Sequence, residues 1–107
     1  MSQRFNPGQQ AMGEVAPKLA ELTDQVLFGD IWERTVLSKR DLSLITVAAL
    51  MAMNRIEQLP FHLGFAERNG VTRPELTELI THLAFYSGWP TAASAVNLLQ
   101  ASKPEQI

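Results

Sequence analysis

Apolar positions recur along the chain with the spacing of helices, and the period-two alternation typical of strands is scarce. From Gly8 to Phe28, one helical stripe carries Met12, Val15, Leu19, Leu22 and Val26. Pro17 should divide this segment into two pieces, because proline disrupts a helix interior. Gly29 then marks a break before Trp32.

A second helix is predicted after Ser38, since Ser38-Lys39-Arg40-Asp41 has the spacing of a capping serine and an acidic residue. The run Leu42–Met53 is apolar around almost its whole circumference. A helix of this kind is normally buried on all sides. In so short a chain, that requires a surrounding ring of helices or a neighbouring subunit, and we expect both.

A third helix is predicted around Pro60. Proline has no N–H to donate, so this helix should begin close before it, near Glu57 or Gln58. Asn69-Gly70 is a typical C-terminal stop.

Two more helices complete the pattern. Thr72-Arg73-Pro74-Glu75 is a capping box with proline in the first turn, and its helix should run to Gly88. Trp89-Pro90 should break it, and a last helix rich in small residues is predicted over Thr91–Ala101. The tail beyond is expected to fray.

Composition narrows the class of protein. The 107 residues predict one domain over residues 1–107, and a net charge of −2 with no basic patch argues against a nucleic-acid partner. The absence of cysteine excludes disulfides, thiolate catalysis and zinc–cysteine sites. The longest apolar run, within residues 44–53, is shorter than the roughly 20 residues that cross a bilayer. The first ten residues lack the apolar segment of a secretory signal, so we expect a cytoplasmic protein without a membrane partner.

The two histidines are the main candidates for chemistry. His62 lies between Phe61 and Leu63, and His82 has Glu78 four residues before it. By their residue types alone, both are more typical of half-buried histidines satisfied by a carbonyl or carboxylate. Neither has a second histidine at helical spacing and no HExxH motif is present, so no metal site is predicted. Phosphate-binding and dinucleotide-binding glycine motifs are absent too, and we expect no cofactor.

Four blocks of sequence carry a resemblance to a known family. They read L-S-K-R-D-L-S-L-I-T-V-A-A-L, E-Q-L-P-F-H-L, R-N-G-V-T-R-P-E-L and I-T-H-L-A-F-Y-S-G-W-P. In order and spacing they resemble the carboxymuconolactone decarboxylase family, from about Gly29 to Ala95. The resemblance implies an all-α, compact five- to six-helix alkylhydroperoxidase-D-like fold that assembles into a ring, a trimer or a hexamer. We expect the 42–53 helix or the Trp32 region at a subunit contact.

The resemblance also separates two branches of the family. The peroxidase branch carries a Cys-x-x-Cys motif before a histidine, and aligning that histidine on His62 puts Arg55 and Gln58 at the cysteine positions. Its assisting acidic residue falls on Ser43. Thiol peroxidase chemistry is therefore excluded. The decarboxylase branch fits Glu57 and His62, but Leu42 stands where that branch usually has an arginine.

By resemblance, the chain is expected to be a cofactor-free decarboxylase or lactone-processing enzyme of aromatic catabolism, acting on a small carboxylate or lactone. His62 would donate a proton or stabilise an oxyanion, and Glu57 would orient the ring or shuttle the proton. Two residues five apart on one regular helix do not converge. Pro60 allows Glu57 to lie at the helix entry, outside that constraint, and the alternative is that each residue meets a partner from another helix or subunit. The predicted substrate-binding residues are Arg40, Arg55, Trp32, His82, Tyr86 and Trp89. The alternative is a ring-forming, non-catalytic binding or scaffold protein, which the leucine at position 42 favours.

Overall fold

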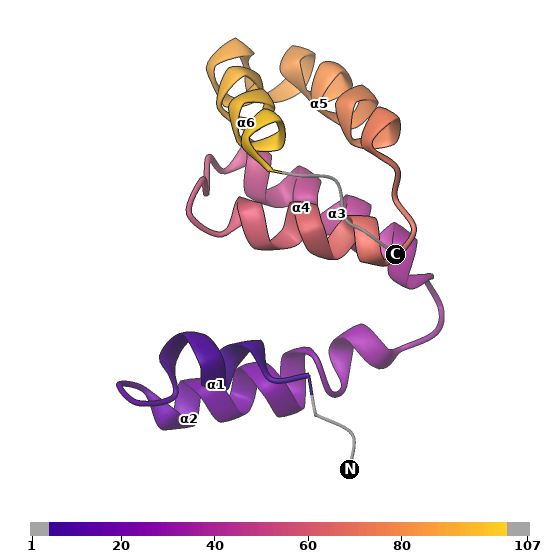
Figure 1. Cartoon of the computed structure of the whole chain (residues 1–107). Helices are drawn as coiled ribbons and strands as arrows, with labels where there is room; N and C mark the ends of the chain where they lie inside the picture. Colours follow the sequence, from indigo (N-terminus) through magenta and orange to yellow (C-terminus); the bar gives the residue numbers. More distant parts are fainter. Residues whose placement is uncertain (1–4, 103–107) are drawn as a thin grey trace. The chain divides into compact units, whose positions relative to one another are not determined.

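A computed structural model of the chain describes residues 5–102. Over that range every regular element is helical, which confirms the predicted all-α fold. Contacts group the residues into an amino-terminal unit that ends at Leu37 and a carboxy-terminal unit that begins at Ser38 (Figure 1). The predictions of a single domain and of a ring assembly stay predictions. The predicted fraying after Ala101 falls almost entirely outside the described residues.

The amino-terminal unit consists of four short helical segments. They are α1 (Pro7–Met12), α2 (Pro17–Leu22), the π turn η1 (Thr23–Leu27) and the 3₁₀ turn η2 (Ile31–Glu33). Pro17 occupies the first position of α2, where its missing N–H leaves no hydrogen bond unmade. The predicted division of this segment at Pro17 is confirmed.

Asp24 ties η1 to the beginning of α1. Its carboxylate accepts hydrogen bonds from the backbone N–H groups of Gly8, at 2.7 Å, and Gln9, at 2.9 Å. These are two of the donors that a helix start leaves without a partner in the helix itself. A Cβ atom on residue 8 would lie 2.7 Å from the carbonyl oxygen of Ala20, so this approach requires glycine.

The buried side chains of this unit are not those of the predicted stripe. Phe28 and Trp32 are buried and stack with ring centroids 5.9 Å apart, and Phe5 meets Phe28 edge-on at 5.1 Å. Val15 and Leu19 are exposed instead. The stripe assumed a constant 3.6-residue period, whereas a turn after α1 and the π turn η1 both change the register.

The carboxy-terminal unit begins with a helical hairpin. α3 (Lys39–Ala52) is capped as predicted, with the Ser38 hydroxyl accepting the N–H of Asp41 at 3.0 Å. α4 (Leu59–Arg68) runs back in the opposite direction with Pro60 in its first turn (Figure 1). Its start lies slightly later than predicted, because the connection turns through Asn54 in a left-handed conformation, at φ 58°.

Two longer helices follow. α5 (Arg73–Ser87) has the predicted capping box and ends at Gly88, whose φ of 105° is a conformation that favours glycine. α6 (Trp89–Ala101) starts two residues before the predicted position, since Pro90 is tolerated in a first turn. α5 packs on α3 and α6, and α4 packs on α3 and α6.

The core of this unit lies where the four helices meet. It contains Val47, Met51, Leu59, Leu63, Ala66, Val71, Leu76, Ile80, Ala84, Ala92, Ala95 and Leu99. Within the single chain α3 is not surrounded, since Ile45 is 54% exposed and Ala49 on the same flank is exposed too, and the expected cover by a neighbouring subunit stays a prediction. One flank of α3 meets α4, α5 and α6, and three neighbours do not encircle it.

The start of α5 connects all four helices of the carboxy-terminal unit through two side chains. The Arg73 guanidinium donates to the Leu99 carbonyl at the end of α6 and to the Ser102 carbonyl at 3.3 Å. It also lies 3.4 Å from the Glu67 carboxylate of α4, a side chain that is only 9% exposed. Glu75, which closes the capping box, pairs with Arg40 of α3.

We expect Arg73→Met to lower the free energy of unfolding by about 1.5–3 kcal/mol, the range for hydrogen bonds to a charged group. Methionine keeps an unbranched stem but leaves the Glu67 carboxylate and the α6 carbonyls without the guanidinium. Urea unfolding of the purified chain measures the change. The matched control is Arg68→Met, because Arg68 is exposed and lies over the Phe65 ring at 5.8 Å; it should cost less than about 1 kcal/mol. Equal losses in both variants would contradict the role given to Arg73.

Candidate functional site

His62 lies in the second turn of α4, beside the residues that fix this helix in the core. Leu59 and Leu63 are buried, and His62 itself is half-buried. Its ring meets Phe61 edge-on at 5.0 Å and Phe65 at 6.1 Å. The Nδ1 atom is shielded from solvent. Burial lowers the pKa of His62 below its ordinary value, because desolvation disfavours the charged ring.

Glu57 and Arg55 lie in the connection between α3 and α4 and are exposed. Glu57 therefore precedes α4, as expected from the position of Pro60, and is not bound by the helical spacing that would separate it from His62. The left-handed turn at Asn54 begins this connection. The structure thus places Arg55, Glu57 and His62 within one short stretch that leads from a surface turn into a fixed helix.

Arg40 is engaged elsewhere. Its guanidinium pairs with Glu75 and lies 3.8 Å from the Asp41 carboxylate. The capping hydrogen bonds with Thr72 and then the charge of Arg40 lower the pKa of Glu75. Of the two predicted arginines, Arg40 therefore has a structural role that Arg55 does not share in the described contacts.

The aromatic candidates occupy two other places. Trp32 is buried against Phe28 in the amino-terminal unit. His82 and Tyr86 stack on the exposed side of α5 with centroids 5.1 Å apart, and Trp89 begins α6. The role of these residues in substrate binding stays a prediction.

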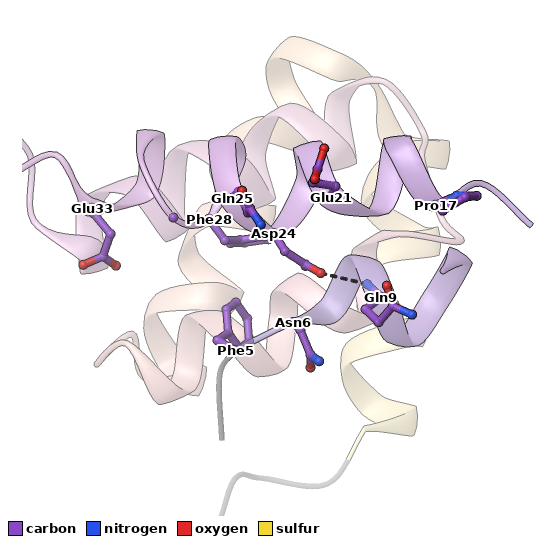
Figure 2. A pocket seen from close by; sticks show the side chains of 10 residues that line it. Phe5, Asn6, Gln9, Pro17, Glu21, Asp24, Gln25, Phe28 and Glu33 are labelled. Carbon is purple, nitrogen blue, oxygen red and sulfur yellow. Dashed lines mark hydrogen bonds between the residues drawn. The ribbon is translucent and has the colours of Figure 1, made fainter. Parts of the chain in front are cut away.

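A cavity of about 980 Å³ lies within the amino-terminal unit (Figure 2). It is lined by Phe5, Asn6, Gln9, Pro17, Glu21, Asp24, Gln25, Phe28, Gly29 and Glu33. Three of these residues are carboxylates, and Asp24 is committed to the start of α1. Such a wall repels an anionic ligand, so the cavity is poorly suited to a carboxylate substrate. Neither His62 nor Glu57 lines it.

A second hollow, of about 340 Å³, is an apolar groove between α5 and α6 that Phe85 and Trp89 border. Phe85 was not among the predicted site residues, although its spacing of four from Trp89 could have indicated the pair. In residues 5–102 no three histidine or acidic side chains converge as a metal site would require. None of the described helices has the length and apolar character to cross a membrane.

The sequence profile of one family matches residues 17–101, which span α2 to α6 and include every predicted site residue. The chain belongs to the carboxymuconolactone decarboxylase family. The match begins twelve residues before the stretch on which the sequence resemblance rested, and it ends six residues after it. The predicted family is confirmed.

Two relatives are similar over much of the chain. A 4-carboxymuconolactone decarboxylase from Acinetobacter baylyi is 38% identical over 73 residues, covering 68% of this chain and 54% of the relative. A nitrosuccinic acid decarboxylase from Metarhizium robertsii is 31% identical over 87 residues, covering 81% of this chain and 61% of the relative. This member of the carboxymuconolactone decarboxylase family thus spans little more than half the length of the curated relatives that it matches.

The lowered pKa of His62 predicts a loss of stability in mild acid. Below about pH 6.5 the histidine of the unfolded chain binds a proton that the folded ring resists, so stability is lost as the pH falls through the folded pKa. We expect a smaller free energy of unfolding at pH 5.5 than at pH 7.5, measured by urea titration, and His62→Gln should reduce the difference. Glu75 also has a lowered pKa, but its stabilising contribution is present at both of these pH values and is lost only when the pH falls below about 4.5, so it does not account for the difference.

The control for this experiment is His82→Gln, since His82 is the other histidine and lies exposed on α5. It should leave most of the pH dependence in place. A pH dependence that disappears in His82→Gln and persists in His62→Gln would contradict the assignment.

Proposed function

We propose that this chain catalyses the loss of carbon dioxide from a small carboxylate whose remaining electron pair is delocalised onto an oxygen. Family membership and the two decarboxylase relatives support the reaction class. The observation that carries the proposal is His62, a desolvated imidazole that contacts two aromatic rings in the helix that follows the exposed turn of Arg55 and Glu57. The first substrate to consider is 4-carboxymuconolactone.

The reaction needs few parts. The bond between the carboxylate carbon and its neighbour breaks, carbon dioxide leaves, and the electron pair stays on the neighbouring carbon. An unsaturated lactone takes up this pair as a dienolate, and a nitro group takes it up as a nitronate. A carbon of the delocalised anion then gains a proton, which comes in the end from solvent. An enzyme must therefore supply a donor aimed at the developing oxyanion and a route for one proton.

The electrostatics of His62 favour one of its two predicted roles. Because burial lowers its pKa, the ring is neutral at neutral pH and one of its nitrogens carries a hydrogen. A neutral imidazole can donate that N–H to an oxyanion without first giving up a proton. The aromatic rings of Phe61 and Phe65 exclude water from one side and strengthen the hydrogen bond.

Glu57 and Arg55 supply the remaining functions in this proposal. Glu57 relays a proton between solvent and the substrate carbon, a role that its exposure in the turn before α4 supports. Arg55 binds the departing carboxylate or a second carboxylate through its planar guanidinium. We assign this role to Arg55 because Arg40 already pairs with Glu75.

Turnover assays test the proposal. The purified chain should release carbon dioxide from 4-carboxymuconolactone or from nitrosuccinate. His62→Gln should lower kcat by roughly 10²-fold while the folded state persists, the scale expected when an oxyanion donor or a general acid is removed. Arg55→Gln should mainly raise KM, whereas Arg40→Gln should lower the unfolding free energy with little effect on KM. A folded His62→Gln variant with the parent's turnover would refute the role of His62.

A non-catalytic binding protein is the second candidate. Leu42 lies where the decarboxylase branch is expected to have an arginine, and Arg40 is held by Glu75. A parent protein that binds these carboxylates in calorimetry, releases no carbon dioxide and loses binding in Arg55→Gln would support this candidate over the enzyme.

A further inference from the structure

α4 ends in the one asparagine of the sequence that is followed by glycine, Asn69-Gly70. Asparagine is thermolabile, because the backbone nitrogen of the next residue can attack the carbon of its side-chain amide. The other asparagines precede Pro7, Arg55 and Leu98. Proline has no N–H to give up, and a side chain on the next residue hinders the approach. Gly70 has neither obstacle, so Asn69 is the asparagine that is chemically most open to this attack.

The fold restrains the attacking nitrogen. The Gly70 N–H donates to the Glu67 carbonyl at 3.1 Å. The Val71 N–H donates to the Ala66 carbonyl at 2.9 Å, and the two bonds together form a Schellman motif. Asn69 has a ψ of 10°, which turns the Gly70 nitrogen away from the Cβ atom of Asn69. The nitrogen can therefore reach the side chain only when this end of α4 opens.

Ser43 restrains the group that would be attacked. The Asn69 side chain donates from Nδ2 to the Ser43 hydroxyl on α3 at 3.0 Å. Ser43 is only 1% exposed and is the one polar side chain that is buried among the described residues. Breaking this bond leaves a buried hydroxyl without its donor, which costs more than the loss of an exposed hydrogen bond. The Asn69 amide is thus held on α3 while α4 is intact.

We infer that Asn69 is a site of spontaneous deamidation, that its hydrogen bond to Ser43 keeps the reaction slow in the folded protein, and that the product loosens the end of α4. In the opened state the Gly70 nitrogen bonds to Cγ of Asn69, and the bond from Cγ to the amide nitrogen breaks. The proton of the Gly70 N–H passes through solvent to the leaving group, which departs as ammonia. Water then opens the cyclic imide at either carbonyl and leaves aspartate or isoaspartate.

The new carboxylate is unfavourable where it forms. It adds a negative charge at the carboxy-terminal end of α4, where the helix dipole is already negative. A carboxylate has no hydrogen to donate to Ser43. Isoaspartate also inserts a carbon into the main chain, which disturbs the spacing of the Schellman motif. The inference does not depend on the proposed decarboxylation, although α4 also carries His62.

Incubation of the full chain in warm, mildly alkaline buffer tests the reaction, with peptide mass spectrometry to locate the converted residue. In urea, which unfolds the chain, Asn69 should convert before Asn6, Asn54 and Asn97. In buffer alone, its conversion should be slower by roughly tenfold or more, because it waits for a local opening of the folded state.

Ser43→Ala tests the restraint. It should speed the conversion of Asn69 in the folded chain by roughly two- to tenfold, the range that one hydrogen bond contributes. The matched control is Thr46→Val, which removes another hydroxyl of α3, one that donates to the Leu42 carbonyl at 2.8 Å. It should keep the parent's rate. Circular dichroism checks that both variants are folded.

Two further measurements complete the test. In the parent, small additions of urea that speed hydrogen exchange of the Gly70 N–H should speed conversion of Asn69 in proportion, which requires no variant. Asn69→Asp reproduces the aspartate product and should shift the urea midpoint of unfolding to a lower concentration. A folded parent that converts at the rate of the unfolded chain, a folded Ser43→Ala variant no faster than Thr46→Val, or an Asn69→Asp variant with the parent's midpoint would each overturn the inference.

Discussion

The start of α5 is the constraint on which the carboxy-terminal unit depends. Helix ends leave backbone groups without partners, and here one guanidinium, that of Arg73, satisfies carbonyls at the end of α6 while it pairs with a carboxylate of α4. Glu67 is almost fully buried, so this pair is less screened than an exposed ion pair. Glu75 closes the cap of its own helix and holds Arg40 of α3. Two residues in the first turn of α5, Arg73 and Glu75, thus connect all four helices of the carboxy-terminal unit.

This arrangement sets the character of the candidate site. α4 is held at its end by Glu67 and along its length by Leu59 and Leu63, so the backbone of His62 is fixed. The residues just before α4 lie in an exposed turn, so their side chains are open to water. In the proposed reaction, the imidazole on a fixed helix would be a preorganised hydrogen-bond donor, and the exposed Glu57 carboxylate would exchange protons with water. In that proposal, the helix α4 supplies the hydrogen-bond donor for the oxyanion, and the turn before it supplies the proton relay.

Polar and apolar groups are distributed in an unusual way over the unit. The hydrogen-bonding residues that join the helices lie partly buried at the start of α5, whereas large aromatic rings at its other end face outward. The exposed flank of α3 around Ile45 adds to this outward apolar surface. A chain of this size has limited interior volume, so apolar side chains beyond its capacity remain on the surface unless another chain covers them.

Local sequence signals determined most of the helices, because capping and proline rules act within one turn of chain. Ser38, the capping box at Thr72, Pro17 and Gly88 all mark boundaries where the structure has them, and the family could be identified from the order of its sequence blocks. The position of Pro60 allowed Glu57 to lie at the entry of the helix of His62, and in the structure that helix begins at Leu59, after Glu57.

Only the tertiary structure decided which faces are buried and which charges are committed. The stripe from Met12 to Val26 does not mark the buried side chains of the amino-terminal unit, because a turn after α1 already interrupts the helical period. Periodicity also gave no sign that Arg73 would reach the end of α6, 26 residues away. The sequence alone does not distinguish Arg40 from Arg55 as a carboxylate-binding residue. The structure does, because Arg40 pairs with Glu75, 35 residues away. The desolvation of His62 likewise depends on which helices pack around it. Which side chains are buried, and which distant residues pair, depends on how the helices pack against one another. Local sequence patterns do not determine that packing.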